Sequence, residues 1–153
     1  MFASFQGLPL HVLVNHFVVV LVPIGALATA AVFLQRDWRK RYAGRVAGAN
    51  VALLALTFVT VRSGLDLQNK LDPTHRSVPG YHHEQYAEAL LWIMVALALV
   101  SLTAWLVARA EGVAPSAVTG FGFAAALLAM AALGLTIAAG HTGAESHWHG
   151  IYN

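Results

Sequence analysis

The chain has 153 residues, of which 58% are hydrophobic and 10% are charged, with a formal net charge of +2 and no cysteine. An ordinary soluble domain has about 25% charged residues. The absence of cysteine excludes disulfides, thiolate metal sites and covalently attached c-type haem. Nucleic-acid binding is not expected either, because the basic residues gather beside an apolar segment.

Long stretches of the chain carry no Asp, Glu, Lys or Arg. These stretches are 1–35, 46–61, 89–108 and 112–144, which together hold 104 residues. A soluble protein of this size would expose most of that apolar surface to water. Each stretch, with a few flanking residues, is close to the about 20 residues of a membrane-spanning helix. The sequence therefore predicts an all-α integral membrane protein, a four-helix bundle that forms a single domain over residues 1–153.

The predicted spans cover about residues 8–34, 46–67, 84–108 and 116–141. Between the first two spans, the predicted loop 36–45 holds five basic residues and one acid, Asp37. Positive loops stay on the cytoplasmic side, so both termini and the 68–83 loop are expected on the non-cytoplasmic side. This composition predicts a multi-pass protein of the inner (plasma) membrane, with the lipid bilayer as its first partner.

The histidines all fall at the predicted outer end of the bundle. They are His11, His16, His75, His82, His83, His141, His147 and His149. Four of them, His11, His16, His83 and His141, lie at overlapping depth at the outer ends of spans one, three and four. Ionisable side chains in a membrane are costly and usually mark a function or a polar partner. We expect the inner half of the bundle, by contrast, to be nearly free of polar groups.

His11 and His16 are five residues apart, which is about 140° around a helix, so they do not share one face. The sequence leaves open which of them faces the bundle interior. Arg62 follows sixteen uncharged residues of span two and is expected in the outer leaflet or at its edge. Glu88 shares a helix face with Glu84 at the start of span three. These acids are equally typical of a solvated helix start.

Several motifs resemble a known family. Gly7-Leu8-Pro9-Leu10-His11 and Asn15-His16-Phe17 open the chain, Ser63-Gly64 ends span two, and Gly140-His141-Thr142-Gly143-Ala144 follows span four. Together they resemble the bacterial four-helix membrane family catalogued as domain of unknown function 2231, especially its short actinobacterial members. The resemblance covers nearly the whole chain. It implies a four-span fold and draws attention to His11, His16, His83 and His141, without supplying an activity.

The first functional hypothesis is a b-type haem protein. Haem held without a covalent bond needs axial imidazoles from facing helices and an apolar slot. His16 with His83 or His141 supplies such a pair, His11 is a further candidate, and Arg62 is placed to meet a haem propionate. This hypothesis predicts redox chemistry on the outer side, with a quinone or another membrane redox subunit as partner.

The second hypothesis is a zinc or copper site built from His11 or His16 with His83, His141 and Glu88, because imidazole and carboxylate suit either ion. The third is a non-catalytic accessory subunit whose polar outer cap docks a larger membrane complex. A homo-oligomer is compatible with all three. No set of catalytic residues is predicted, so the sequence leaves open whether the protein is an enzyme.

Overall fold

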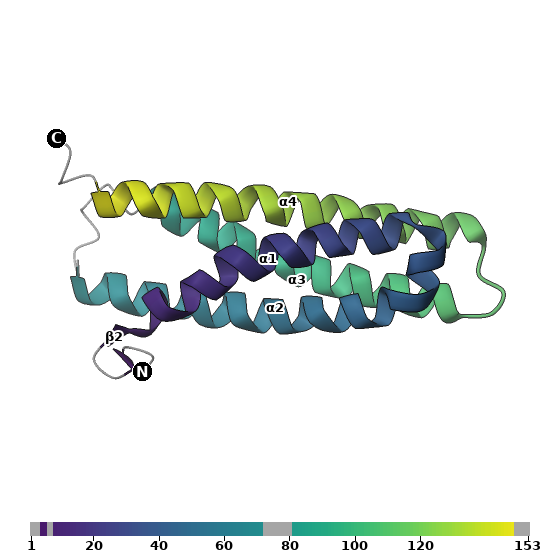
Figure 1. Ribbon diagram of the computed structural model, residues 1–153, viewed down its shortest axis with the longest axis horizontal. Coiled ribbons are helices and arrows are strands. Elements are labelled where there is room, and N and C mark those ends of the chain that lie inside the picture. Colours follow the sequence, from purple (N-terminus) through teal and green to yellow (C-terminus); the bar gives the residue numbers. More distant parts are fainter. Residues whose placement is uncertain (1–3, 6–7, 72–80, 149–153) are drawn as a thin grey trace.

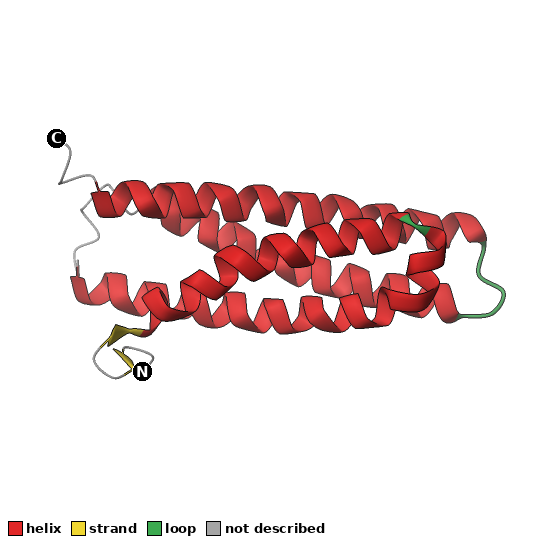
Figure 2. Ribbon diagram, in the orientation of Figure 1, coloured by secondary structure: helices red, strands yellow, loops and turns green. Residues whose placement is uncertain are grey.

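The computed structural model describes residues 4–5, 8–71 and 81–148, and describes only the backbone of residues 4–5, 8–9, 71, 81 and 146–148. Its helices are α1 (Leu10–Leu34), α2 (Arg36–Leu71), α3 (Tyr81–Arg109) and α4 (Pro115–Trp148). Before α1, the two-residue strands β1 (Ser4–Phe5) and β2 (Leu8–Pro9) pair antiparallel (Figure 2). All four helices are long and apolar enough to cross a membrane, which confirms the all-α, four-span prediction.

The helices run alternately up and down and form a ring (Figure 1). Helix α1 packs beside α2 and α4, and α3 packs beside the same two helices, so α1 and α3 face each other diagonally. At one end of the bundle α1 and α3 begin while α2 and α4 finish; we call it the histidine end. At the opposite end, called the basic end, short connections join α1 to α2 and α3 to α4.

The helices extend beyond the predicted spans. The predicted loop 36–45 is wrong, because these residues form the first turns of α2, which begins two residues after α1 ends. Arg and Lys are good helix formers, and the segment contains no proline to stop the helix. The Arg39 guanidinium also donates to the carbonyl oxygen of Phe33 at 3.0 Å, which satisfies an acceptor at the end of α1. Helix α4 likewise continues past residue 141 to Trp148, so the Gly140–Gly143 stretch is helical.

The packing is that of a protein surrounded by lipid. The core cluster nearer the histidine end combines small and branched residues: Val18, Val22, Ala26, Leu90, Met94, Leu97, Ala129 and Ala132. Large apolar side chains point outward instead, with Trp92 66% exposed and Leu127 71% exposed. In water, such a surface would aggregate, whereas a bilayer solvates it. Small residues in the core let the helices approach closely where lipid provides no hydrophobic drive.

A polar cluster lies inside the bundle near the basic end. Asn50 Nδ2 donates to Thr29 Oγ1 at 3.1 Å and to Ser101 Oγ at 3.3 Å, which links α2 to α1 and α3. The two hydroxyls donate to the carbonyls of Gly25 and Ala98. All three side chains are buried. The expectation of a nearly nonpolar inner half is therefore wrong. The sequence did not reveal this cluster, because one uncharged polar residue on each of three helices does not interrupt the hydropathy of any span. We call Thr29, Asn50 and Ser101 the Asn50 cluster.

Candidate functional site

His11 lies in the first turn of α1 and points into the bundle. Its Nδ1 is 3.0 Å from the carbonyl oxygen of Thr60 on α2. A carbonyl oxygen only accepts hydrogen bonds, so Nδ1 carries the proton and donates it. In the neutral imidazole, Nε2 then keeps its lone pair, and no described residue forms a hydrogen bond with that atom.

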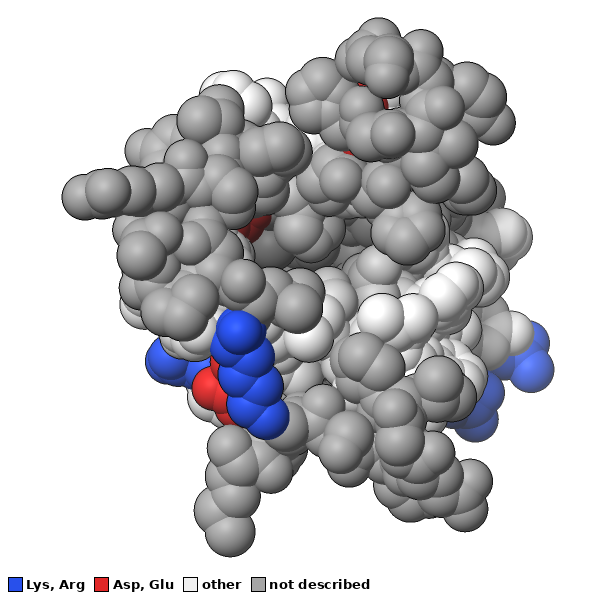
Figure 3. All heavy atoms as spheres, turned by 90° about the vertical axis from the view of Figure 1, so that its left-hand side faces the viewer, with Lys and Arg blue, Asp and Glu red and all other residues white. Residues whose placement is uncertain are grey.

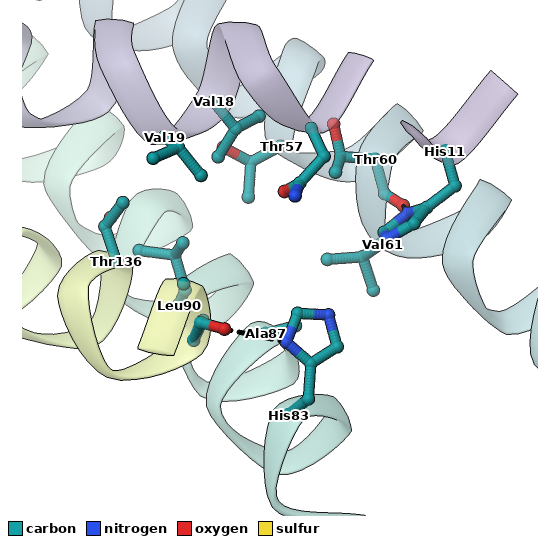
Figure 4. Close-up of a pocket in the computed structure, with 13 residues that line it drawn as sticks. His11, Val18, Val19, Thr57, Thr60, Val61, His83, Ala87, Leu90 and Thr136 are labelled. Carbon is teal, nitrogen blue, oxygen red and sulfur yellow. Dashed lines mark hydrogen bonds between the residues drawn. The ribbon is translucent and has the colours of Figure 1, made fainter. Parts of the chain in front are cut away.

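His83 repeats this arrangement on the diagonal helix. It lies in the first turn of α3, and its Nδ1 donates to the carbonyl oxygen of Ala139 on α4 at 2.8 Å. The two imidazole rings lie edge to face, with centroids 6.2 Å apart and planes 78° apart. Figure 4 shows both rings directed into the space between the helices. His11 and His83 are thus two oriented imidazoles, each with Nε2 available to a ligand; we call them the histidine pair.

Two glycines make room for these rings. A Cβ atom on Gly64 of α2 would lie 2.9 Å from the His11 ring, and one on Gly143 of α4 would lie 3.0 Å from Nδ1 of His83. Such distances are shorter than van der Waals contact, so an alanine at either position requires the ring to shift. Glycine therefore lets each ring approach the backbone of its neighbouring helix.

The histidine pair borders a small cavity of about 30 Å³. The other polar side chains that line it are Asn15, Thr57, Thr60 and Thr136. The three threonine hydroxyls donate to carbonyls of their own helices. No Asp, Glu, Lys or Arg side chain lines the cavity among the described residues. Seen from the histidine end, Lys and Arg side chains are visible at the lower left and at the right of the molecule (Figure 3). Apart from the two imidazoles, the described lining therefore carries no ionisable side chain.

The remaining predicted site residues do not join the pair. His16 is exposed on the outside of α1, where its Nδ1 donates to the Val12 carbonyl at 2.7 Å. The His141 side chain is 73% exposed, with Nε2 3.6 Å from Glu145 Oε1. Arg62 is exposed, its guanidinium 5.3 Å from the centroid of the Phe58 ring. Glu88 is also exposed.

Within the described part of the chain, no three His, Asp or Glu side chains come together as a possible metal site. His75 and His149 lie outside the described residues, and so does the side chain of His147. His82 is exposed at the start of α3. What the structure brings together is therefore His11 with His83, and not the larger set.

The supporting parts of this site were not predicted as functional. Gly64 and Gly143 belong to the motifs quoted above, and each is the only residue type that leaves space for a ring on a facing helix. The glycines themselves were a possible signal, because a glycine often marks a place where another group approaches the backbone closely. The carbonyl acceptors of Thr60 and Ala139 carry no side-chain signal at all.

Comparison with known proteins adds a family. Residues 7–152 match the family described as "Predicted membrane protein (DUF2231)". The chain belongs to this family. The DUF2231 match spans the histidine pair and both glycines, so the site lies wholly within the family's region. No curated protein and no solved structure matches the chain significantly. The DUF2231 assignment thus supports the membrane fold and gives no chemistry for the site.

Proposed function

We propose that this protein binds a single monovalent copper ion between His11 and His83 at the histidine end of the bundle. The observation that carries the proposal is that both Nδ1 atoms are engaged by backbone carbonyls while both imidazole rings line one small cavity. Metal-binding histidines characteristically donate their second ring nitrogen to a carbonyl or carboxylate, which fixes tautomer and direction. The predicted orientation puts this site on the non-cytoplasmic side.

The spacing of the two rings supports an ion of this kind. With metal–nitrogen bonds of about 2.0–2.1 Å, two imidazoles on one ion have ring centroids about 5–6.5 Å apart, depending on the angle at the metal. The observed 6.2 Å lies within that range. Imidazole suits copper, and monovalent copper accepts two nitrogen ligands in a near-linear arrangement.

The charge of the site favours a monovalent ion over zinc. Structural zinc sites have four protein ligands, and catalytic ones have three, whereas the described residues bring only two imidazoles together here. The cost of burying an ion rises with the square of its charge, and no carboxylate of the described residues lines the cavity to offset a divalent ion. Copper in its lower oxidation state is therefore the better match.

Haem is the second candidate, because His11 and His83 come from diagonal helices of the bundle, as the two axial ligands of a haem can. A cavity of about 30 Å³ is far smaller than the about 300–1,000 Å³ of sites that enclose cofactors. Haem binding would thus require the helices to separate at the histidine end. A single ion needs far less space than haem.

The test is copper affinity of the purified protein in detergent, measured anaerobically by competition with a Cu(I) chelator. We expect one equivalent of copper, and a loss of at least about 100-fold in affinity for His11→Ala and for His83→Ala, since each removes half of the ligands. The matched controls are His16→Ala and His141→Ala, which remove exposed imidazoles and should change the affinity less than twofold. Circular dichroism checks that all four variants keep their helices.

Other results would redirect the assignment. A Soret absorption band that depends on His11 and His83 would favour haem. Stoichiometric zinc with no copper would point to the divalent alternative. A protein that binds neither metal nor haem would leave the accessory-subunit hypothesis as the better account.

A further inference from the structure

The carbonyl that holds the His11 ring has a second hydrogen-bond donor. Ser63 Oγ donates to the Thr60 carbonyl oxygen at 3.0 Å, and His11 Nδ1 donates to the same oxygen at 3.0 Å. Ser63 is only 2% exposed, so its hydroxyl is kept on this oxygen away from the surface of the bundle. The Thr60 carbonyl is therefore shared between a hydroxyl of its own helix and an imidazole of the neighbouring helix.

The carbonyl that holds the His83 ring has the same pair of donors. Thr142 Oγ1 donates to the Ala139 carbonyl oxygen at 3.3 Å, and His83 Nδ1 donates to that oxygen at 2.8 Å. The Thr142 hydroxyl also lies 2.9 Å from the Ala138 carbonyl oxygen, so its single proton is divided between two acceptors. The arrangement on α4 thus repeats that on α2, with a weaker bond from the hydroxyl to the shared carbonyl.

The spacing along the two helices is also the same. In each helix the hydroxyl follows the shared carbonyl by three residues, and the glycine that makes room for the ring follows it by four. The two sets are Thr60, Ser63 and Gly64 on α2, and Ala139, Thr142 and Gly143 on α4. Residues three and four apart lie on one face of a helix. Acceptor, hydroxyl and glycine therefore meet the ring together in both halves of the bundle.

A hydroxyl in this position changes the direction of the carbonyl. In a straight α-helix each carbonyl points along the axis to the N–H four residues ahead, and not toward a neighbouring helix. A Ser or Thr hydroxyl that bonds to a carbonyl of the preceding turn bends the helix, and carbonyls of a bent helix tilt away from its axis. A tilted carbonyl presents a lone pair to the side of the helix, where an imidazole can reach it.

We propose that Ser63 and Thr142 are positioning residues of the histidine pair, whose hydroxyls hold the two shared carbonyls in the direction that fixes the His11 and His83 rings. Because each carbonyl then keeps the proton on Nδ1, Nε2 keeps its lone pair for a ligand. The consequence for copper rests on the proposed function, whereas the effect on the rings is expected in the metal-free protein as well.

The test is nitrogen NMR of the metal-free protein in detergent, with isotopically labelled histidine. The ring signals report which nitrogen carries the proton, and His11→Ala and His83→Ala assign the signals of the pair. Ser63→Ala should lower the ratio of Nδ1-protonated to Nε2-protonated His11 about fivefold, the effect of about one hydrogen bond, and leave His83 unchanged. Thr142→Ala should lower the ratio for His83 about two- to threefold and leave His11 unchanged, because its hydroxyl is shared.

Conservative variants are the matched controls. Ser63→Thr and Thr142→Ser exchange the two residue types but keep each hydroxyl, so both ratios should stay within about twofold of the unmodified protein. Thr119→Ala removes an exposed hydroxyl of α4 that bonds to the Pro115 carbonyl, and should change neither ring. Alanine favours helix more than serine or threonine does, so the alanine variants should fold, which circular dichroism verifies.

Chelator competition measures the consequence for copper. Ser63→Ala should lower the affinity for Cu(I) about 3- to 10-fold, since the imidazole keeps its chemistry and loses part of its direction. If the rings change as expected but the unmodified protein binds no copper, the proposed function is wrong and the role of the hydroxyls stands.

Three results would overturn the role of the hydroxyls. The first is an unchanged His11 ratio in Ser63→Ala, which would show that the Thr60 carbonyl keeps its direction without the hydroxyl. The second is an equal change of both rings in either alanine variant, which would indicate a general loss of packing. The third is the same loss in Thr142→Ser as in Thr142→Ala.

Discussion

The histidine pair and the Asn50 cluster both place polar side chains inside an apolar bundle, yet they use their hydrogen-bonding atoms differently. In the Asn50 cluster, the amide and both hydroxyls bond to one another or to nearby carbonyls. In the histidine pair, Nδ1 of each ring donates a hydrogen bond to a carbonyl, and Nε2 has no described hydrogen-bond partner. Polar side chains that hydrogen-bond to one another hold helices together, whereas a polar atom without a protein partner is available to a ligand. This difference is why we propose a structural role for the first region and ligand binding for the second.

The largest expected effect is stabilisation by the ion itself. Free Cu(I) at 100 times its dissociation constant should raise the free energy of unfolding by about 2.7 kcal/mol, because the ion binds the folded state alone. His83→Ala should lose this stabilisation, and Asn50→Ala should keep it. The measurement is unfolding in detergent with and without copper. Equal stabilisation of the His83→Ala protein would place the ion elsewhere.

The glycines beside the rings provide a subtler test. Gly64→Ala and Gly143→Ala should each lower copper affinity about 10- to 100-fold, since the new methyl group displaces an imidazole that keeps its chemistry but loses its direction. Gly48→Ala on α2 and Gly134→Ala on α4 are the matched controls, because a Cβ at either site meets nothing within 4 Å. Chelator competition compares the four variants. Similar losses in test and control variants would mean that ring direction does not matter.

The Asn50 cluster should respond in stability rather than binding. Asn50→Ala should lower the free energy of unfolding by about 1–2 kcal/mol, because it removes the amide that links three helices. Copper affinity should stay within twofold of the unmodified protein. Thr103→Ala serves as control, since this exposed hydroxyl bonds only to its own helix at the Leu99 carbonyl. A large loss of copper affinity in Asn50→Ala would show that the Asn50 cluster also takes part in binding.

The sequence allowed the helices to be predicted, because stretches without charge are long enough to span a bilayer. It did not reveal that residues 36–45 continue α2, since a run of Arg and Lys is compatible with both a loop and a helix. The spacing of His11 and His16 correctly separates their faces but does not say which one turns inward. Packing decides this, because Gly64 leaves space opposite His11. Asn50 was missed because one amide barely changes the hydropathy of a span.

The order of the helices places the two members of the histidine pair on different helical hairpins. The His11 ring is anchored to α2 and the His83 ring to α4, so each imidazole is fixed within its own helical hairpin. The hairpins α1–α2 and α3–α4 each close at the basic end. An ion shared by both rings would therefore link the two hairpins directly at the end where α1 and α3 begin.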